Sequence, residues 1–151
     1  MRVLLQRVNH ASVVVGTETV GEINRGLLIY AGLQASDTQA VTKRMCERIL
    51  NYRVFPDDQG RMNLSLMDVG GGILLVSQFT LAAETHRGNR PGFSTAMAAE
   101  EAQSIFEGFV AAVRDRVQML PISVATGQFQ ADMQVKSIND GPINFLLEVP
   151  T

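Results

Sequence analysis

The chain lacks features that several classes of protein require. It has one cysteine among its 151 residues, so no disulfide can form within it. No apolar run approaches the roughly 20 residues that span a membrane. The residues after Met1 hold an early charge at Arg2 and no apolar segment of signal-peptide length. We therefore expect a cytoplasmic protein that has no membrane partner.

Few side chains are available for metal or nucleophilic chemistry. His10 and His86 are the two histidines, and they show no paired ligand spacing, so we expect no metal and no cofactor. Ser77, His86 and Asp132 are the residue types of a hydrolase triad, but no Gly-x-Ser-x-Gly segment surrounds the serine. The glycine triplet 70–72 lacks the Lys-Ser/Thr of a phosphate-binding loop, so it predicts a tight turn.

The sequence also has little net charge. A net charge of −2 gives no global basic field of the kind that holds proteins along nucleic-acid duplexes. A protein that grips one end of a nucleic acid is still compatible with this charge. Eleven of the 13 basic residues are arginines, which suit forked contacts with phosphate or carbonyl groups, although a high-GC coding bias would produce the same composition.

The length suits a single domain, residues 1–151. Apolar stripes predict two helices, one that begins at a capping box of Ser36 and Gln39 and one near 96–118. Apolar runs and alternation predict strands at 2–8, 11–15, 18–24, 26–33, 53–55, 73–81, 122–125, 131–138 and 143–149. The strands do not alternate with helices, which predicts an α+β fold with a mainly antiparallel, barrel-like sheet. The chain is short for so much sheet, so we expect dimerisation to complete its burial.

Two segments break the local pattern, and such positions are candidate functional sites. The first is 77–80, where Ser-Gln-Phe-Thr follows the aliphatic run 73–76. The end of a buried strand presents backbone N–H groups and small hydroxyls at the rim of a sheet, where they suit an oxyanion or the edge of an adenine. Phe79 adds an apolar or stacking surface.

The second segment is Asn139–Pro142, at the start of the last predicted strand. A cis bond before proline costs only about 0.5–1 kcal/mol, and a cis bond between Gly141 and Pro142 would turn its carbonyl oxygens in one direction. Two parallel carbonyls can hold an ammonium group and discriminate by shape. The same residues also predict an ordinary turn, and by themselves they leave both interpretations open.

These two segments and several others, in order and over essentially the whole chain, resemble the D-aminoacyl-tRNA deacylase family. The matching segments are Leu5–Val8, Ala11–Val13, Cys46–Arg48, Met62–Leu64, Ser77–Leu81, Arg90–Pro91, Phe129–Val135 and Asn139–Pro142. The family hydrolyses the ester between a D-amino acid and the 3′-terminal adenosine of tRNA. The resemblance implies this activity here, without a cofactor and in translation quality control.

The resemblance also implies the place of the site. It implies a homodimer that binds the acceptor end of tRNA, with each active site at the subunit interface. The residues implied to receive the terminal adenosine and the scissile carbonyl are Ser77, Gln78, Phe79 and Thr80, and further substrate-binding residues are Ala131 and Met133.

Gly141 and Pro142 are implied to form the Gly-cis-Pro motif of the family, which reaches into the partner's site. Its carbonyls would hold the α-amino group, so that an L side chain collides with the motif while glycine, which is achiral, passes. Arg7 and Asn139 are implied to support this motif. Asn144 stands where the family usually has threonine, so we expect the support there to differ and the activity to persist.

Two mechanisms are open for such a site. Thr80 would attack the ester as a nucleophile, or backbone N–H groups near Phe79 would polarise the carbonyl while the 2′-hydroxyl of the terminal ribose helps to activate water. We favour the second, because the sequence offers no evident base near Thr80. Two other classes stay open: a non-catalytic module that binds a tRNA end or a nucleotide, and a small-molecule esterase that uses Ser77.

Overall fold

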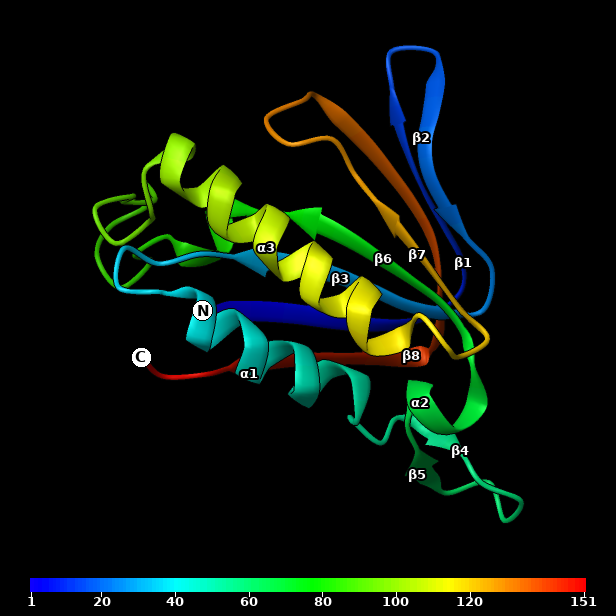
Figure 1. Ribbon diagram of the computed structural model, residues 1–151. Helices are drawn as coiled ribbons and strands as arrows, with labels where there is room; N and C mark the ends of the chain where they lie inside the picture. Colours follow the sequence, from blue (N-terminus) through cyan, green and yellow to red (C-terminus); the bar gives the residue numbers. More distant parts are fainter.

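The fold is built around one strongly curved sheet with two long helices along one side of it (Figure 1). The computed structural model describes residues 1–151. In chain order the elements are β1 (Arg2–Val15), β2 (Glu18–Ile23), β3 (Gly26–Gly32), α1 (Gln39–Leu50), β4 (Phe55–Pro56), β5 (Met62–Leu64), α2 (Leu66–Val69), β6 (Gly71–Ser77), the 3-10 turn η1 (Phe79–Ala82), α3 (Ala99–Val117), β7 (Ile122–Thr126) and β8 (Met133–Glu148).

The main sheet has the strand order β2-β1-β3-β6-β7, and β8 pairs with the other edge of β1. The strand β1 pairs antiparallel with β2, β3 and β8, whereas β3–β6 and β6–β7 are parallel pairs. The sheet is therefore mixed, with antiparallel pairs in the majority. The predicted α+β class is confirmed.

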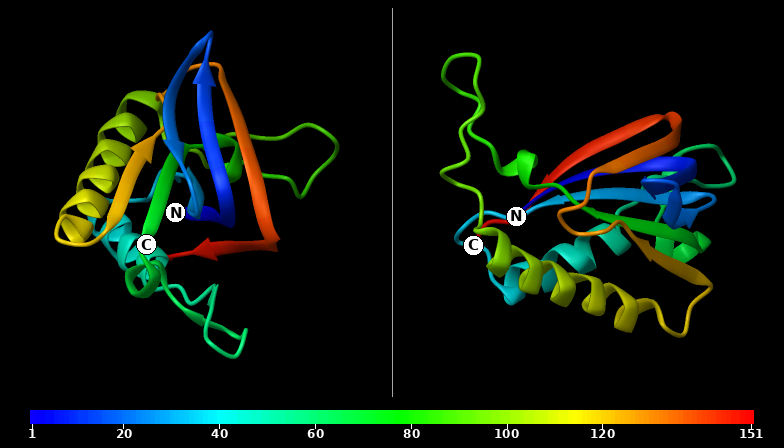
Figure 2. Two further views of the ribbon diagram at one scale, coloured as in Figure 1. Left: turned by 90° about the vertical axis from the view of Figure 1, so that its right-hand side faces the viewer. Right: turned by 90° about the horizontal axis from the view of Figure 1, so that it is seen from above.

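The sheet curls until it is nearly closed (Figure 2). Strand β2 approaches β7 so closely that a side chain on Gly21 would collide with the carbonyl oxygen of Thr126. This curl encloses a small core of Val8, Ala11, Val13, Ile23, Leu28, Leu74 and Val76. The barrel-like shape expected from the many strands is present in one chain.

A larger core lies between the sheet and the helices. Helix α1 buries Met45, Cys46 and Ile49, and α3 buries Phe106 and Phe109 against the same face. Burial and the neighbouring Glu47 raise the pKa of the Cys46 thiol to about 11, so the thiol stays protonated. Cys46 therefore packs as a small apolar side chain in this core.

The strand predicted at 73–81 is wrong at its end. Strand β6 stops at Ser77, because the Gln78 backbone N–H makes the last sheet bond, to the Ala31 carbonyl at 2.8 Å, and the chain then enters η1. The strands predicted at 2–8 and 11–15 are one strand, β1, and those predicted at 131–138 and 143–149 are likewise one, β8.

The predicted start of the first helix is also wrong. The residue before α1 is Thr38, which makes no side-chain capping bond. The chain instead has a capping box at α2, where Ser65 and Asp68 bond reciprocally. Helix α2 is a third helix that the apolar pattern missed, because four residues are too few to show a stripe. Gly70 ends it with a φ of 72°, in agreement with the predicted turn.

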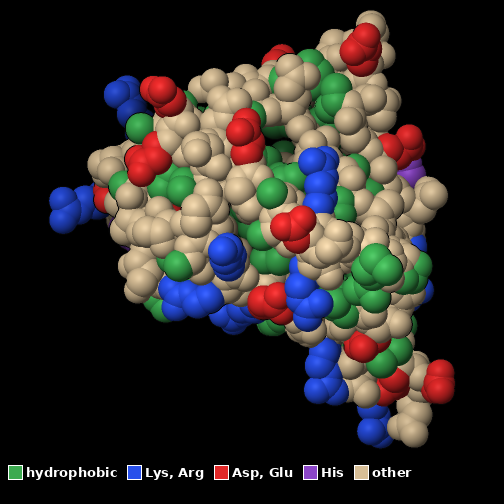
Figure 3. Space-filling model, viewed as in Figure 1, with side chains coloured by type: hydrophobic (Ala, Val, Ile, Leu, Met, Phe, Trp, Pro, Cys, Tyr) green, Lys and Arg blue, Asp and Glu red, His purple; other side chains and the backbone are tan.

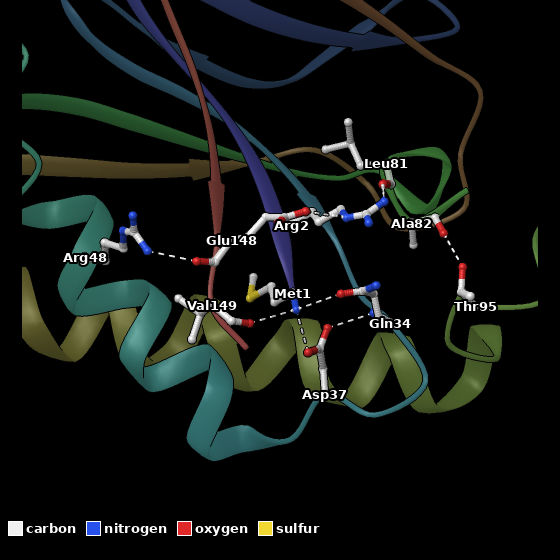
Figure 4. Close-up of polar contacts among 10 residues, drawn as sticks. All are labelled: Met1, Arg2, Gln34, Asp37, Arg48, Leu81, Ala82, Thr95, Glu148 and Val149. Atoms are coloured by element: carbon white, nitrogen blue, oxygen red, sulfur yellow. Dashed lines mark hydrogen bonds and ion pairs between the residues drawn. The ribbon is translucent and has the colours of Figure 1, made fainter. Parts of the chain in front are cut away.

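The two ends of the chain lie side by side at one end of the sheet (Figure 4). The α-ammonium of Met1 lies 2.6 Å from Asp37 Oδ1, and both groups are fully buried. Arg2 forms an ion pair with Glu148 and donates to the Leu81 carbonyl, which connects β1 and β8 to η1. None of the helices combines the length and apolar character needed to cross a bilayer.

Candidate active site

A cavity of about 730 Å³ opens at the end of β6. Its walls come from the end of β6 and the start of η1, from the start of α3 and from the segment that leads into β8. The residues that line it are mostly hydrophobic: Leu33, Val76, Ser77, Gln78, Phe79, Met97, Ala99, Ala102, Phe129, Gln130, Ala131, Met133 and Val135. It therefore brings together five residues singled out from the sequence, Ser77, Gln78, Phe79, Ala131 and Met133.

The turn η1 forms one wall because the chain leaves the sheet there. The backbone N–H of Leu81 donates to the Gln78 carbonyl at 3.2 Å. The N–H groups of Phe79 and Thr80 precede this bond and have no acceptor within the turn, as is usual in the first turn of a helix. A Cβ on Gly32 would lie 2.7 Å from that of Leu81, so only glycine lets the turn pack on β3.

The aromatic ring of Phe79 stands at the mouth of the cavity. Phe79 is 58% exposed, and its ring centroid lies 5.2 Å from that of Phe93. A large aromatic side chain that is this exposed beside a hollow suits the face of another ring.

Thr80 points elsewhere. It lies in a second hollow of about 480 Å³, together with Gln6, Tyr30 and Ser137. Its hydroxyl accepts a hydrogen bond from Gln78 Nε2 at 2.5 Å. The Gln78 amide N–H cannot accept the proton of this hydroxyl. Burial raises the pKa of the Tyr30 hydroxyl, so Tyr30 stays neutral and does not act as a base. The hollow around Thr80 therefore contains no general base.

The residue types of a triad are not joined. Ser77 lies half-buried at the end of β6, while His86 and Asp132 are exposed on separate loops. No hydrogen bond connects any two of these three side chains. The other histidine of the chain, His10, bonds to Glu22 and not to a serine. No group of three or more His, Cys, Asp or Glu side chains is arranged so that it could hold a metal ion.

The segment around Gly141 is a bulge in β8. Gln6 pairs with Asn144 and Val8 with Asn139, so one residue of β1 faces the four residues 140–143. The Gly141–Pro142 peptide bond is cis, and Gly141 has a φ of 114°. Strand β8 bends sharply in this region, where its colour passes from orange to red (Figure 2).

Arg7 and Asn139 hold the two sides of the bulge. Asn139 Nδ2 donates to the Arg7 carbonyl at 2.9 Å and to the Ile143 carbonyl at 3.2 Å. The Arg7 guanidinium donates to the Val54 carbonyl at 2.6 Å, and its Nε lies 2.9 Å from Asp140 Oδ2. This Nε–H is buried and not aligned for a hydrogen bond, so the contact with Asp140 is an ion pair alone.

The Asn144 side chain hydrogen-bonds to the neighbouring strand and to no residue of the bulge. Its Oδ1 accepts a hydrogen bond from Gln6 Nε2 at 2.9 Å, within an exposed cross-strand pair. Neither hollow described above is lined by Gly141 or Pro142. In one chain, the two segments singled out from the sequence therefore do not form one site.

Sequence reasoning missed several residues of the cavity wall, among them Met97, Ala99 and Gln130. Ala99 begins α3 and Met97 lies just before it, and this segment meets β6 only in the folded chain. Gln130 is the one non-glycine residue with a positive φ, 59°, at the tight turn beside the cavity. Gln130 lies within Phe129–Val135, one of the segments that carry the resemblance to the family, and this match could have identified it.

These features define an α+β protein with a largely apolar site at the edge of its sheet. Residues 4–148 match the family described as D-Tyr-tRNA(Tyr) deacylase. The chain is 52% identical over 148 residues to a D-aminoacyl-tRNA deacylase of Pseudomonas aeruginosa (strain LESB58), with 98% of this chain and 99% of that one covered. It is 48% identical to a D-aminoacyl-tRNA deacylase of Saccharophagus degradans, with 97% and 99% covered.

Two solved structures are similar along the whole chain. One, described as c-Myc DNA Unwinding Element Binding Protein, has a TM-score of 0.93 and 40% identity, with 100% of both chains covered. The other is a probable eukaryotic D-amino acid tRNA deacylase with a TM-score of 0.81 and 98% of both chains covered; at 18% identity it shows the fold alone.

The chain belongs to the D-Tyr-tRNA(Tyr) deacylase family, whose members are hydrolases that act on ester bonds. The predicted family and the predicted enzyme class are thus confirmed. Among the interpretations that the sequence left open, this membership favours the enzyme over the non-catalytic binding module.

Proposed function

We propose that this chain hydrolyses the ester bond of D-aminoacyl-tRNA and spares L-aminoacyl-tRNA. The observation that carries the proposal is the cavity beside η1 in a chain of the deacylase family. Ligand pockets commonly hold about 300–1,000 Å³, and the cavity, at about 730 Å³, has room for a nucleoside. Its apolar walls and the exposed Phe79 ring suit the faces of an adenine.

The chemistry assigned to this site uses backbone groups. The free N–H groups of Phe79 and Thr80 donate to the ester carbonyl oxygen as negative charge develops on it. A water oxygen attacks the carbonyl carbon and the bond to the ribose 3′-oxygen breaks. The proton of the water passes through the neighbouring 2′-hydroxyl to the leaving 3′-oxygen. The products are the free D-amino acid and tRNA.

This route is preferred over attack by Thr80 because of the environment of its hydroxyl. The hydroxyl accepts its hydrogen bond from an amide, and the titratable residue that lines the hollow is the neutral Tyr30. A nucleophilic hydroxyl needs an adjacent base. The same argument applies to the esterase hypothesis, because Ser77 has no hydrogen-bonded base either.

Selection against L-amino acids is assigned to the bulge of a second copy. Gly141 and Pro142 are exposed and line neither hollow of their own chain. On the same strand, Ile138 and Leu146 are 60% and 61% exposed, which gives β8 an apolar surface for a partner. In the dimer proposed here the carbonyls of the bulge hold the substrate's α-amino group, an L side chain collides with it, and glycine is accepted.

The test is the deacylation of one tRNA charged in parallel with D-tyrosine, L-tyrosine and glycine. We expect rapid loss of the D-tyrosyl and glycyl esters and retention of the L-tyrosyl ester. Loss of no ester would contradict the catalytic proposal, and equal loss of both tyrosyl esters would contradict the role of the bulge. A tRNA that ends in 2′-deoxyadenosine should not be hydrolysed if the 2′-hydroxyl assists.

Asn144→Thr provides a matched variant for the same assay. Because Asn144 bonds to Gln6 and not to the bulge, we expect the ratio of D-tyrosyl to L-tyrosyl turnover to stay unchanged. A changed ratio would show that this position acts on the motif across β8.

A further inference from the structure

The residues 84–93, between η1 and α3, line neither of the two hollows. We propose that the loop Glu84–Gly92 and the adjacent Phe93 grip the single-stranded RNA that leads to the terminal adenosine. Phe93 stacks a base outside the cavity, and Arg87 and Arg90 bind the phosphates. The inference rests on the proposed function, because it takes the terminal nucleoside to occupy the cavity beside Phe79.

The loop stands at the rim of the cavity. It follows η1, which begins with the wall residue Phe79, and it returns to another wall residue, Met97. Because both ends of the loop join the cavity wall, RNA that leaves the cavity on the side of Phe79 passes close to it. Figure 2 shows the loop projecting from the body of the protein in both views.

The base of the loop is fixed while its tip is free. Glu84 and Gly92 exchange two backbone hydrogen bonds, at 2.8 and 3.0 Å. Thr95 Oγ1 donates to the Ala82 carbonyl at 2.6 Å (Figure 4), and the Met97 backbone N–H donates to the Leu33 carbonyl. These bonds lie on both sides of Phe93 and hold it beside Phe79, independently of the conformation of the residues 85–91 at the tip.

The two rings form one exposed aromatic surface. The Phe79 and Phe93 centroids are 5.2 Å apart with the planes tilted by 49°, and Phe93 is 42% exposed. Single-stranded nucleic acids bind proteins through such rings because every base has a face that stacks. Phe93 therefore extends the stacking surface outward, from the nucleoside in the cavity to the next base.

The tip supplies unpaired positive charge. Arg87 and Arg90 are exposed, and neither forms an ion pair, whereas Arg2, Arg7 and Arg116 each do. Basic side chains project outermost from the molecule at the edge where this loop lies, with acidic side chains behind them (Figure 3). Arginine is the side chain best suited to forked phosphate contacts.

The experiment measures RNA binding separately from hydrolysis. The probe is a dye-labelled RNA tetranucleotide that ends in a 3′ adenosine, and the fluorescence anisotropy gives its Kd at several KCl concentrations. Each phosphate released from contact lowers the slope of log Kd against log salt by about 0.7 for single strands, so Arg87→Ala with Arg90→Ala should lower it by about 1.4. Arg61→Ala is the control: it removes an exposed arginine from the turn between β4 and β5, at the other end of the molecule (Figure 1).

The stacking part is tested with two substitutions of one residue. Phe93→Leu should weaken binding of the tetranucleotide about fivefold or more, because stacking on the ring is lost, and Phe93→Tyr should restore it. Binding of adenosine alone should change in neither variant. An unchanged salt slope in the double arginine variant, or an equal fall with Arg61→Ala, would overturn the phosphate contacts, and wild-type binding by Phe93→Leu would overturn the stacking.

Failure of this inference is distinguishable from failure of the proposed function. The tetranucleotide carries no ester, so a protein that binds it through the loop but hydrolyses no aminoacyl-tRNA retains the inference and loses the function. A protein that deacylates normally but whose salt slope does not depend on Arg87 and Arg90 retains the function and loses the inference.

Discussion

Arg7 and Asn139 are the residues that join the bulge of β8 to the rest of the sheet. One Arg7 side chain reaches both the Val54 carbonyl and the Asp140 carboxylate. Asn139 spans the bulge by donating to the carbonyls on both sides of it. Such a short segment keeps one shape because its polar groups are bonded to fixed neighbours, which is what a selectivity element needs.

At the same scale, Thr80→Ala distinguishes the two mechanisms. The variant removes the hydroxyl and leaves the backbone N–H groups of η1 in place. We expect the kcat for D-tyrosyl-tRNA to stay within about threefold of wild type, since loss of a true nucleophile typically costs several orders of magnitude. A single-turnover assay checks this, and a fall of a thousandfold would establish the covalent route instead.

Gly141→Ala tests the role of the bulge by adding one carbon atom, the Cβ of alanine, to it. The new Cβ would lie 2.7 Å from Ile143 Cγ1 and 3.1 Å from Arg7 Nη2, at a φ of 114° that alanine rarely adopts. We expect the kcat/KM for D-tyrosyl-tRNA to fall at least tenfold while the protein stays folded, because the bulge is at the surface. Such a fall corresponds to about 1.4 kcal/mol.

Gly16→Ala is the matched control for that variant. Gly16 also has a positive φ, 61°, but nothing lies within 4 Å of its Cβ position. It carries the backbone strain without the collision. If both variants lost the same activity, general strain rather than the shape of the bulge would be the cause.

Among the elements, the short helix α2 has its first turn capped by one titratable group. The Asp68 carboxylate accepts hydrogen bonds from the Ser65 N–H at 2.8 Å and from the Ser65 hydroxyl at 2.9 Å. These bonds, with the charge of Arg53, hold the pKa of Asp68 below its usual range. The carboxylate thus caps the N-terminus of a four-residue helix that packs Leu66 into the core.

The lowered pKa predicts a direction for the pH dependence of stability. A group whose pKa is lower in the folded state contributes stability above its unfolded pKa and loses it as the pH falls through the folded pKa. Wild type should therefore be more stable than Asp68→Asn in urea at neutral pH, and the difference should vanish in acid. Asp115→Asn, which removes an exposed carboxylate that accepts no hydrogen bond, is the control; a difference for Asp68→Asn that persisted at low pH would contradict the assignment.

For the molecule as a whole, the separation of the cavity from the bulge is the decisive feature. The cavity lies at the end of β6, whereas the bulge lies on β8 opposite Arg7 and lines neither hollow. In a single copy the bulge therefore forms no part of the wall of either hollow. Under the proposed function, a second copy has to supply the bulge.

This arrangement predicts complementation between two inactive variants. Gly141→Ala keeps the cavity and damages the bulge, and Ala131→Trp fills the cavity and keeps the bulge. Each alone should be nearly inactive. After the two are unfolded and refolded together, about a quarter of the sites in a twofold dimer combine an intact cavity with an intact bulge, so activity towards D-tyrosyl-tRNA should return. A mixture that stays inactive would show that both parts act within one chain.

How far the sequence predicted the fold depends on the range of the interactions. The apolar stripe of 96–118 and the alternation after Ile143 depend on neighbours a few residues away, and α3 and the end of β8 confirm them. The end of β6 was misplaced, because only the Ala31 carbonyl on β3 determines where the ladder stops. The start of α1 was misplaced for a similar reason: Asp37 turns toward the α-ammonium of Met1, and Ser36 makes no cap.

The sequence by itself determined the class of the protein, because composition, apolar periodicity and the order of short motifs are local properties. It singled out the residues 77–80 and 139–142 as unusual, and the resemblance named their family. Only the tertiary structure decided that the first segment ends a strand at a cavity, and that the second is a bulge held by Arg7 that lines neither hollow. The end of β6 depends on its pairing with β3, and the bulge depends on the pairing of β8 with β1, in which Gln6 lies opposite Asn144. No local pattern records pairing between residues so far apart along the chain.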